Sequence, residues 1–291
     1  MIKAAIVGYG NIGKAAHEAI SQAGDFSLEY IVEKEEISSS VPVLKSVSEL
    51  SGIDVAIICL PSRLVPDTAQ EILSAGISTV DCYDIHTNIL NLRSKLDAIA
   101  KQNNCTAITA AGWDPGTDSV IRALFLAMLP KGITYTNFGP GMSMGHSVAA
   151  KSIPGVKDAL SMTIPTGSGV HRRMVYIELE QGADFDTVSK AILEDEYFAG
   201  DQTHVIRVDS VDRLRDVGHG VNLFRKGVAG TTGNQRLEFN MSINNPALTG
   251  QVLVSSARAA LKKKPGCYTM IEIPPINFLC GGRDELIREL V

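Results

Sequence analysis

The first 130 residues alternate short apolar runs with amphipathic stretches. The apolar runs are AAIVG, LEYIV, DVAIICL, STVDCY and TAITAAG, and segments such as LVPDTAQEILSAG and NLRSKLDAIAKQ lie between them. Nearly continuous apolar strands that alternate with helices are typical of a parallel sheet covered on both faces. The pattern therefore predicts an α/β fold with a doubly wound parallel sheet.

After Pro130 the apolar positions follow a period of two, most clearly in QRLEFNMSI. Such alternation indicates strands with one buried and one solvated face, as in an antiparallel sheet. RRMVYIELE and THVIRVDSV are further candidate strands, and FDTVSKAILEDEYF is a candidate helix. We therefore predict a second, α+β domain with a largely antiparallel sheet that starts near residues 115–130. A long helix over NNPALTGQVLVSSARAALKK, a strand YTMIEI and a short helix DELIREL are predicted to follow.

The composition narrows the choice of ligand and compartment. The 291 residues are 45% hydrophobic and carry a formal net charge of −5. This charge offers no basic surface to nucleic acid or anionic lipid, so a small-molecule ligand is expected. The apolar runs are too short to span a membrane and the start lacks the features of a signal peptide, so we predict a cytoplasmic protein. Cys59, Cys82 and Cys105 are expected to be reduced core thiols, and no metal site is predicted.

The segment AAIVGYGNIGKAAHEAI places Gly8, Gly10 and Gly13 in the spacing G-x-G-x-x-G, between a predicted strand and a predicted helix. These glycines suit a tight turn, a close approach to a pyrophosphate and close packing of helix on strand. In this context the motif predicts dinucleotide binding rather than a purely structural turn. Glu33, about 20 residues further on, suits a ribose diol and repels a 2'-phosphate, whereas Lys34 attracts one. The pair indicates NAD or mixed NAD(P) use, unless both are solvated loop charges.

Two acidic residues follow predicted strands of the first domain. Asp84 in TVDCYDIH and Asp114 in AAGWDPG lie where such sheets bind ligands, outside the carboxyl ends of the strands. Two neighbouring carboxylates suit a cationic group such as an amine. The alternatives are that Asp84 caps the following helix and that Asp114 only forms a turn. That turn needs Pro115 and Gly116 but not Trp113, so Trp113 is also a candidate site residue.

The second domain offers further candidates, each of which also has an ordinary structural explanation. Arginine forks match carboxylates, but arginines on strands are usually solvated. Asn245 suits a helix cap before Pro246, and an apolar residue such as Phe138 is more often core. The candidates are Phe138, Met144, Thr163, Arg172, Arg173, His219, Asn244 and Asn245.

Eight segments together carry a family resemblance. They are, in chain order, GYGNIG, DCYDIH, AAGWDPGTDS, NFGPGMSMGHS, IPGVKDALSMTIP, DVGHG, INNPALT and KPGCYTMIEIP. In this order they resemble the shorter class of the meso-diaminopimelate dehydrogenases over almost the whole chain. The resemblance implies a Rossmann domain at 1–116, a substrate-binding and dimerisation domain at 117–245, and a C-terminal return to the first domain at 246–291. It also implies a homodimer that works in lysine and cell-wall precursor metabolism. The implied reaction is the NADP-dependent, reversible oxidative deamination of the D-centre of meso-2,6-diaminopimelate, which gives L-2-amino-6-oxopimelate and ammonia.

The resemblance also implies roles for the individual residues that match the family's motifs. Asp84 and Asp114 are implied as the catalytic residues, which orient the amine and are candidate proton acceptors. Cofactor binding is implied for Gly8, Tyr9, Gly10, Asn11, Ile12, Gly13, Glu33, Lys34, Leu60, Pro61, Ser62, Tyr83 and Trp113. The reacting D-centre is implied to be surrounded by Asp84, Trp113, Asp114, Phe138, Met144 and Gly145, and the distal L-configured end to be held by Thr163, Arg173, His219 and Asn245.

The chain departs from the family pattern at two places. Glu33 and Lys34 stand where members commonly have Arg or Ser followed by Arg, so use of NAD beside NADP is expected. Phe138 and Met144 stand where some members have Trp and Gln, so a pocket that accepts other amino acids is expected. The alternative functions are an NAD(P)-dependent reductase or dehydrogenase of another small amino acid or imine, and a non-catalytic NAD(P)-binding sensor.

Overall fold

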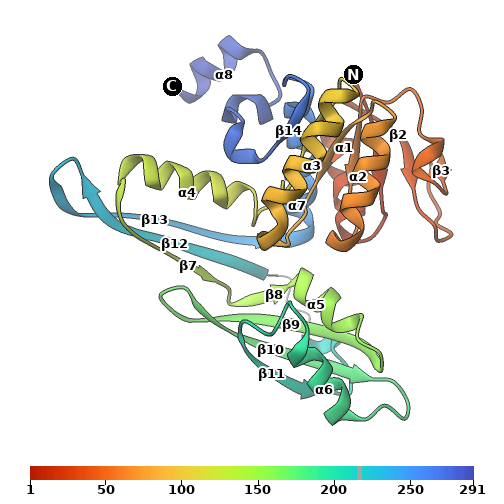
Figure 1. Ribbon diagram of the computed structural model, residues 1–291, viewed down its shortest axis with the longest axis vertical. Helices are drawn as coiled ribbons and strands as arrows, with labels where there is room; N and C mark the ends of the chain where they lie inside the picture. The colour runs from red at the N-terminus through yellow and green to blue at the C-terminus, as the bar shows by residue number, and fades with distance from the viewer. Residues whose placement is uncertain (215–217) are drawn as a thin grey trace. The chain divides into compact units, whose positions relative to one another are not determined.

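The computed structural model describes residues 1–214 and 218–291, which form two compact units. Unit 1 contains Met1–Ile121 and Pro246–Val291, and unit 2 contains Arg122–Asn245 (Figure 1). Each unit has its own sheets and its own apolar core.

Unit 1 is built on a seven-stranded parallel sheet, which confirms the predicted doubly wound fold. Its strands are β1 (Ile2–Val7), β2 (Phe26–Val32), β3 (Val43–Leu44), β4 (Val55–Ile58), β5 (Ser78–Asp81), β6 (Thr106–Ile108) and β14 (Gly266–Tyr268). They lie in the order β14-β6-β5-β4-β1-β2-β3, and every neighbouring pair is parallel. The strand order reverses beside β1, which is where such sheets bind ligands.

Helices cover both faces of this sheet because successive strand residues point to opposite sides. They are α1 (Asn11–Gln22), α2 (Val65–Ser74), α3 (Ile89–Gln102) and α7 (Asn245–Ala260). Unit 1 also contains α8 (Arg283–Leu290) and the residues up to Ile121 of α4 (Thr117–Met128). Val7 and Ile58 share an apolar core with α2 and α3, whereas Ile6 and Ile57 share one with α1 and α7. α7 and α8 confirm the two helices predicted for the end of the chain. In the described residues no helix is long and apolar enough to cross a membrane.

In its described residues, unit 2 contains two sheets and two helices besides the end of α4. Its elements are β7 (Lys131–Phe138), β8 (Gly141–Ser143), α5 (Met144–Lys151), β9 (Val156–Gly167), β10 (Val170–Leu179), α6 (Phe185–Glu194), β11 (Gln202–Arg207), β12 (Gly218–Ala229) and β13 (Thr232–Asn244). The sheet β13-β12-β7 is antiparallel; in the sheet β11-β10-β9-β8 the pair β10 and β11 is parallel and the other pairs are antiparallel. The prediction of a largely antiparallel second domain is therefore confirmed.

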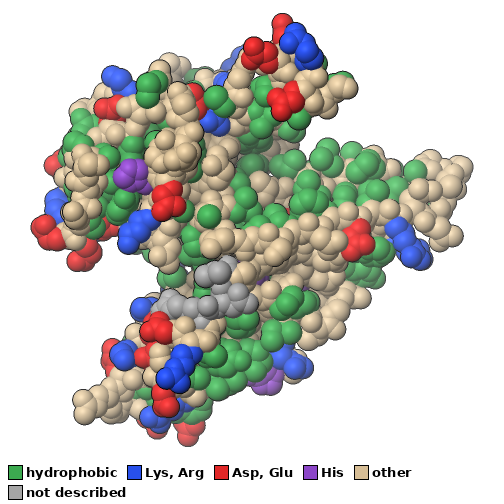
Figure 2. All heavy atoms as spheres, turned by 180° about the vertical axis from the view of Figure 1, so that it is seen from behind, with side chains coloured by type: hydrophobic (Ala, Val, Ile, Leu, Met, Phe, Trp, Pro, Cys, Tyr) green, Lys and Arg blue, Asp and Glu red, His purple; other side chains and the backbone are tan. Residues whose placement is uncertain are grey.

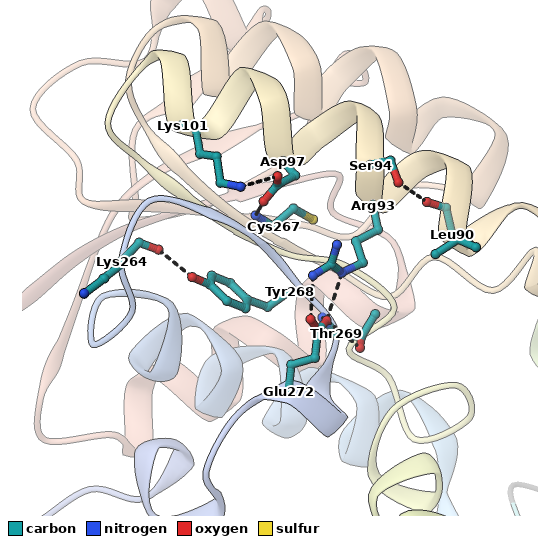
Figure 3. Close-up of polar contacts among 10 residues, drawn as sticks. All are labelled: Leu90, Arg93, Ser94, Asp97, Lys101, Lys264, Cys267, Tyr268, Thr269 and Glu272. Carbon is teal, nitrogen blue, oxygen red and sulfur yellow. Dashed lines mark hydrogen bonds and ion pairs between the residues drawn. The ribbon is translucent and has the colours of Figure 1, made fainter.

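The segment YTMIEI is not the strand that its apolar pattern predicts. β14 ends at Tyr268, and the backbone N–H of Thr269 donates to Glu272 Oε2 at 2.8 Å in a capping box. Arg93 Nε of α3 donates to the same oxygen at 2.9 Å (Figure 3). These polar contacts fold the segment into the 3-10 turn Met270–Glu272. Further 3-10 turns in the described part of the chain are Val47–Glu49, Ser62–Leu64, His86–Asn88, Asp212–Leu214 and Pro275–Phe278.

Candidate active site

The glycine loop between β1 and α1 has the steric properties that dinucleotide binding requires. Gly8 has a φ of +91°, and a Cβ atom on Gly13 would lie 2.1 Å from the carbonyl oxygen of Gly8. A side chain at either position would therefore disrupt the loop. Gly10 directly precedes α1, and a Cβ on it would meet no atom within 4 Å. In the described residues no side chain caps α1 and its first turn holds no acidic residue, so its N-terminal N–H groups fit a pyrophosphate.

Glu33, at the end of β2, lies against this loop. Its Oε2 accepts a hydrogen bond from the backbone N–H of Tyr9 at 2.7 Å, and its Oε1 accepts one from that of Lys34 at 2.8 Å. Burial works to raise the pKa of Glu33, but the backbone N–H groups of Tyr9, Glu35 and Lys34 outweigh it and hold this pKa below its usual value. Lys45 Nζ donates to the carbonyls of Lys34 and Glu35 at 3.1 and 3.0 Å. A fixed negative charge therefore lies beside the glycine loop.

The loops after β4 and β5 bring Ser62 and Asp84 together. Ser62 Oγ donates to Asp84 Oδ1 at 2.6 Å and accepts from the backbone N–H of Asp84 at 3.1 Å. The N-cap of the following 3-10 turn is Ile85, so Asp84 does not occupy the capping position considered as its alternative role. Asp84 is instead fixed at the carboxyl edge of the sheet.

The other residues predicted near these two loops have different surroundings. Leu60 touches the glycine loop, since its Cδ2 would lie 2.8 Å from a Cβ on Gly8. The ring of Tyr83 is buried in the core with α2 and α3, and its hydroxyl accepts a hydrogen bond from Asn88 Nδ2 at 3.0 Å. The hydroxyl of Tyr83 is therefore used inside unit 1.

Asp81, at the end of β5, anchors the loop that carries Trp113 and Asp114. Its Oδ1 accepts hydrogen bonds from Thr109 Oγ1 at 2.9 Å and from the backbone N–H of Ala110 at 3.1 Å. In the described part of the chain, its Oδ2 has no hydrogen-bond partner. Burial raises the pKa of Asp81 to about 6 despite these hydrogen bonds. Sequence reasoning did not single out this residue, because a buried aspartate at a strand end has no distinctive motif.

The turn WDPG itself is tightly folded. The backbone N–H of Gly112 donates to the carbonyl of Pro115 at 3.0 Å, and a Cβ on Gly116 would lie 1.8 Å from the carbonyl oxygen of Gly112. The carbonyl of Trp113 accepts a hydrogen bond from the backbone N–H of Asp118 in α4 at 3.0 Å. The side chain of Trp113 is buried. Asp114 is half-buried at the tip of the turn. The turn thus holds a tryptophan and a carboxylate in defined positions.

In unit 2 the structure brings Phe138, Thr163, Arg173 and His219 into one cluster on neighbouring strands. Arg173 on β10 donates from Nη1 to Oγ1 of Thr163, its partner on β9. The backbone N–H of Phe138 donates to His171 Nε2 at 2.8 Å, and the two rings are 5.3 Å apart. His219 on β12 lies beside β8, since a Cβ on Gly141 would be 2.8 Å from its Cα. Met144 and Gly145 begin α5, directly after β8, and Asn245 follows β13.

Three further residues of this cluster were missed. Asp201 Oδ2 accepts from Arg173 Nε at 2.6 Å, and His146 Nδ1 lies 2.9 Å from Ser143 Oγ. Burial, and then the charge of Arg173, lower the pKa of His146 to about 4 and that of His171 below its usual value. His171 could have been found from the sequence, because it stands two residues before Arg173 on one strand face. Asp201 and His146 carry no such signal.

Arg172 has a different partner from those of Arg173. Its Nε donates to Gln202 Oε1 at 3.2 Å on an exposed part of the sheet, away from the partners of Arg173. Among the residues that the structure describes, no group of three or more His, Cys, Asp or Glu side chains could hold a metal ion.

Comparisons with known proteins agree along the whole chain. The family described as "Oxidoreductase family, NAD-binding Rossmann fold" matches residues 2–110, and "Diaminopimelic acid dehydrogenase C-terminal domain" matches residues 112–170. A meso-diaminopimelate D-dehydrogenase of Bacteroides fragilis is 57% identical over 100% of this chain and 99% of its own length. The structure of C. glutamicum DAP dehydrogenase in complex with DAP is 28% identical, with a TM-score of 0.91 over 100% of this chain and 99% of that one. An engineered D-amino acid dehydrogenase bound to NADP+ is 26% identical, with a TM-score of 0.90 and the same coverage.

Proposed function

The chain belongs to the meso-diaminopimelate D-dehydrogenase family, and we propose that it catalyses the NADP-dependent oxidative deamination of the D-centre of meso-2,6-diaminopimelate. The products are L-2-amino-6-oxopimelate and ammonia, and the reverse reaction is a reductive amination. The observation that carries this proposal is the 57% identity over the full chain to a dehydrogenase of this name. The structure adds that Asp84 and Arg173 make side-chain hydrogen bonds, and that Asp114 lies in a turn closed by backbone hydrogen bonds.

The glycine loop and the residues around it would hold the cofactor. Gly8 to Gly13 and the N-terminus of α1 fit the pyrophosphate, and Glu33 and Lys34 lie at the end of β2, where adenosine ribose is recognised in such folds. We assign Leu60, Pro61, Ser62, Tyr83 and Trp113 to the remaining part of the same site. Bound NADP+ supplies the hydride acceptor for the oxidation.

Asp84 and Asp114 are assigned to the reacting amine. Their carboxylates attract an ammonium group and orient the carbon that bears it, and orientation of this kind supplies a large part of many rate enhancements. The amine must lose a proton before the carbon is oxidised, and we assign the acceptance of this proton to one of the two carboxylates or to a bound water. Ser62 supports this assignment because it fixes one oxygen of Asp84 at 2.6 Å.

The residues of the unit 2 cluster are assigned to the substrate. Phe138, Met144 and Gly145 contribute to the site of the D-centre, and Thr163, Arg173, His219 and Asn245 hold the distal end. We likewise assign cofactor binding to residues 1–116, substrate binding and dimerisation to 117–245, and a return to the first domain to 246–291. Pairing of β14 with β6 supports the last assignment, because it places the C-terminal segment in the sheet of unit 1.

An assay of cofactor reduction tests the proposal. The purified enzyme is expected to reduce NADP+ when meso-diaminopimelate is added, with release of one ammonia for each NADPH formed. A protein that binds NADP+ but reduces none of it with any amino acid would be a sensor. Activity confined to other D-amino acids would indicate a different dehydrogenase.

We also propose a cytoplasmic homodimer. All five cysteines are free thiols, as is usual in a reducing compartment. Leu124, Leu126 and Met128 of α4 and Ile133 of β7 are each about half exposed, and Figure 2 shows hydrophobic side chains along this part of unit 2. Exposed apolar patches of this kind mark protein interfaces, and a second copy of the chain is the partner that the family resemblance implies. Cell fractionation tests the location.

A further inference from the structure

The distal end of the proposed substrate is an amino acid in its own right, with one carboxylate and one ammonium group. A charged group that leaves water needs a charged or hydrogen-bonding partner of its own. The residues assigned to this end include Arg173, a cation for the carboxylate, but none of them is an anion for the ammonium.

Asp201 supplies such an anion beside Arg173. It directly precedes β11, whose parallel pairing with β10 places Gln202 opposite Arg172. Asp201 Oδ2 and Arg173 Nε are 2.6 Å apart, and the two side chains are 27% and 12% exposed, so the pair is neither fully solvated nor sealed in the core.

Each partner also has unused capacity. Within residues 1–214 and 218–291, Asp201 Oδ1 accepts no hydrogen bond, and Arg173 donates from Nε and Nη1 but not from Nη2. The pair therefore offers guanidinium N–H groups and a carboxylate oxygen next to each other. Burial, and then the charge of Arg173, lower the pKa of the nearby His146 to about 4 and also lower that of His171, so neither ring competes with Arg173 as the cation of this cluster. Asp201 is the carboxylate that this cluster offers to a ligand.

We propose that Asp201 binds the ammonium group of the distal, L-configured end, so that Arg173 and Asp201 together recognise the zwitterion. This inference rests on the proposed function, and it assigns Asp201 a contact with substrate rather than only the role of a counterion to Arg173. The enzyme then discriminates against analogues that keep the distal carboxylate but lack the distal amine.

The test compares two substrates in the wild-type enzyme and in Asp201→Asn. One is meso-diaminopimelate and the other is D-2-aminopimelate, which lacks only the distal amino group. In Asp201→Asn, kcat/KM for meso-diaminopimelate is expected to fall about tenfold or more, and that for D-2-aminopimelate to stay within about twofold. The ratio of the two values does not depend on the fraction of enzyme that folds. Asp201→Glu, which keeps the charge, is expected to restore part of the ratio.

Asp158→Asn is the matched control, since Asp158 forms a 3.0 Å ion pair with Lys151 in the same unit and is not assigned to the site. It is expected to leave the ratio unchanged. Calorimetric titration of meso-diaminopimelate into the NADPH-loaded enzyme should show the same loss of affinity in Asp201→Asn without turnover.

Two results would overturn the inference while the proposed function stands. If Asp201→Asn lowers kcat/KM equally for both substrates, Asp201 only positions Arg173. If kcat/KM falls for neither substrate, Asp201 lies outside the site. A wild-type enzyme that does not oxidise meso-diaminopimelate would instead overturn the proposed function itself.

Discussion

At the scale of single residues, Asp114 is the most direct test of the reaction. It lies at the tip of a turn that the backbone of Gly112 and Pro115 already closes, so its carboxylate is not needed to form that turn. Asp114→Asn keeps the shape and removes the charge that we assign to binding of the amine. We expect kcat/KM for meso-diaminopimelate to fall at least about a hundredfold, with NADPH affinity close to wild type by fluorescence titration. Near-normal turnover would return Asp114 to the role of a turn residue.

Glu33 is the residue to which we assign an influence on the choice between NADP and NAD. Its negative charge, stabilised by backbone N–H groups, lies at the end of β2 and would repel a 2'-phosphate. Glu33→Arg is therefore expected to raise the preference for NADP, as the ratio of kcat/KM values, by roughly tenfold or more. Glu33→Gln is the control for the lost contact with Tyr9, because it keeps an acceptor for that N–H and removes only the charge. Equal ratios in all three proteins would mean that Glu33 does not face the ribose.

At the scale of elements, Asp81 ties the loop after β6 to the end of β5. Its pKa of about 6 in the fold lies above the usual 3.8, so its ionisation opposes folding. Stability contributed by protonated Asp81 is therefore lost as the pH rises through the window from about 4 to about 6. Asp81→Asn removes this loss and keeps an acceptor for Thr109 and Ala110.

Urea unfolding of both proteins across this window checks the prediction. As the pH rises, the free energy of unfolding of the wild type is expected to fall relative to that of Asp81→Asn, by up to about 3 kcal/mol. The difference between the two proteins isolates Asp81, because other carboxylates such as Asp25 and Glu272 have lowered pKa values and act in the opposite direction in both. Parallel pH profiles would show that folding does not change the pKa of Asp81.

At the scale of the whole molecule, the exposed apolar residues of α4 and β7 bear on assembly. Leu124 and Met128 are four residues apart and so lie on one helix face. Replacing both by Glu is expected to shift the mass in sedimentation from about twice the 31.1 kDa of one chain toward that of one chain. Leu90→Glu, at an exposed position on α3, is the control and should leave the mass unchanged. A wild type that sediments as one chain at micromolar concentration would contradict the dimer.

The sequence alone determined the parts of this protein that depend on local rules. The apolar runs identified the parallel strands because a sheet covered on both faces needs continuous apolar strands. The spacing of Gly8, Gly10 and Gly13 identified the cofactor loop because a Cβ at the first or third position would collide with backbone. Pro246 in the first turn of α7 was equally visible, since proline is tolerated at a helix start.

Only the tertiary structure decided which distant residues meet. The pairing of β10 with β11 brings Asp201 to Arg173, 28 residues earlier, and the pairing of β1 with β2 brings Glu33 to Tyr9, 24 residues earlier. Tertiary contacts also explain why YTMIEI is not the predicted strand: Arg93 and the backbone N–H of Thr269 donate hydrogen bonds to Glu272, and the segment forms a 3-10 turn. The alternation of apolar residues along the chain cannot reveal such contacts. A hydrogen bond between distant residues depends on which strands and helices pack together, and not on the residues next to them in the sequence.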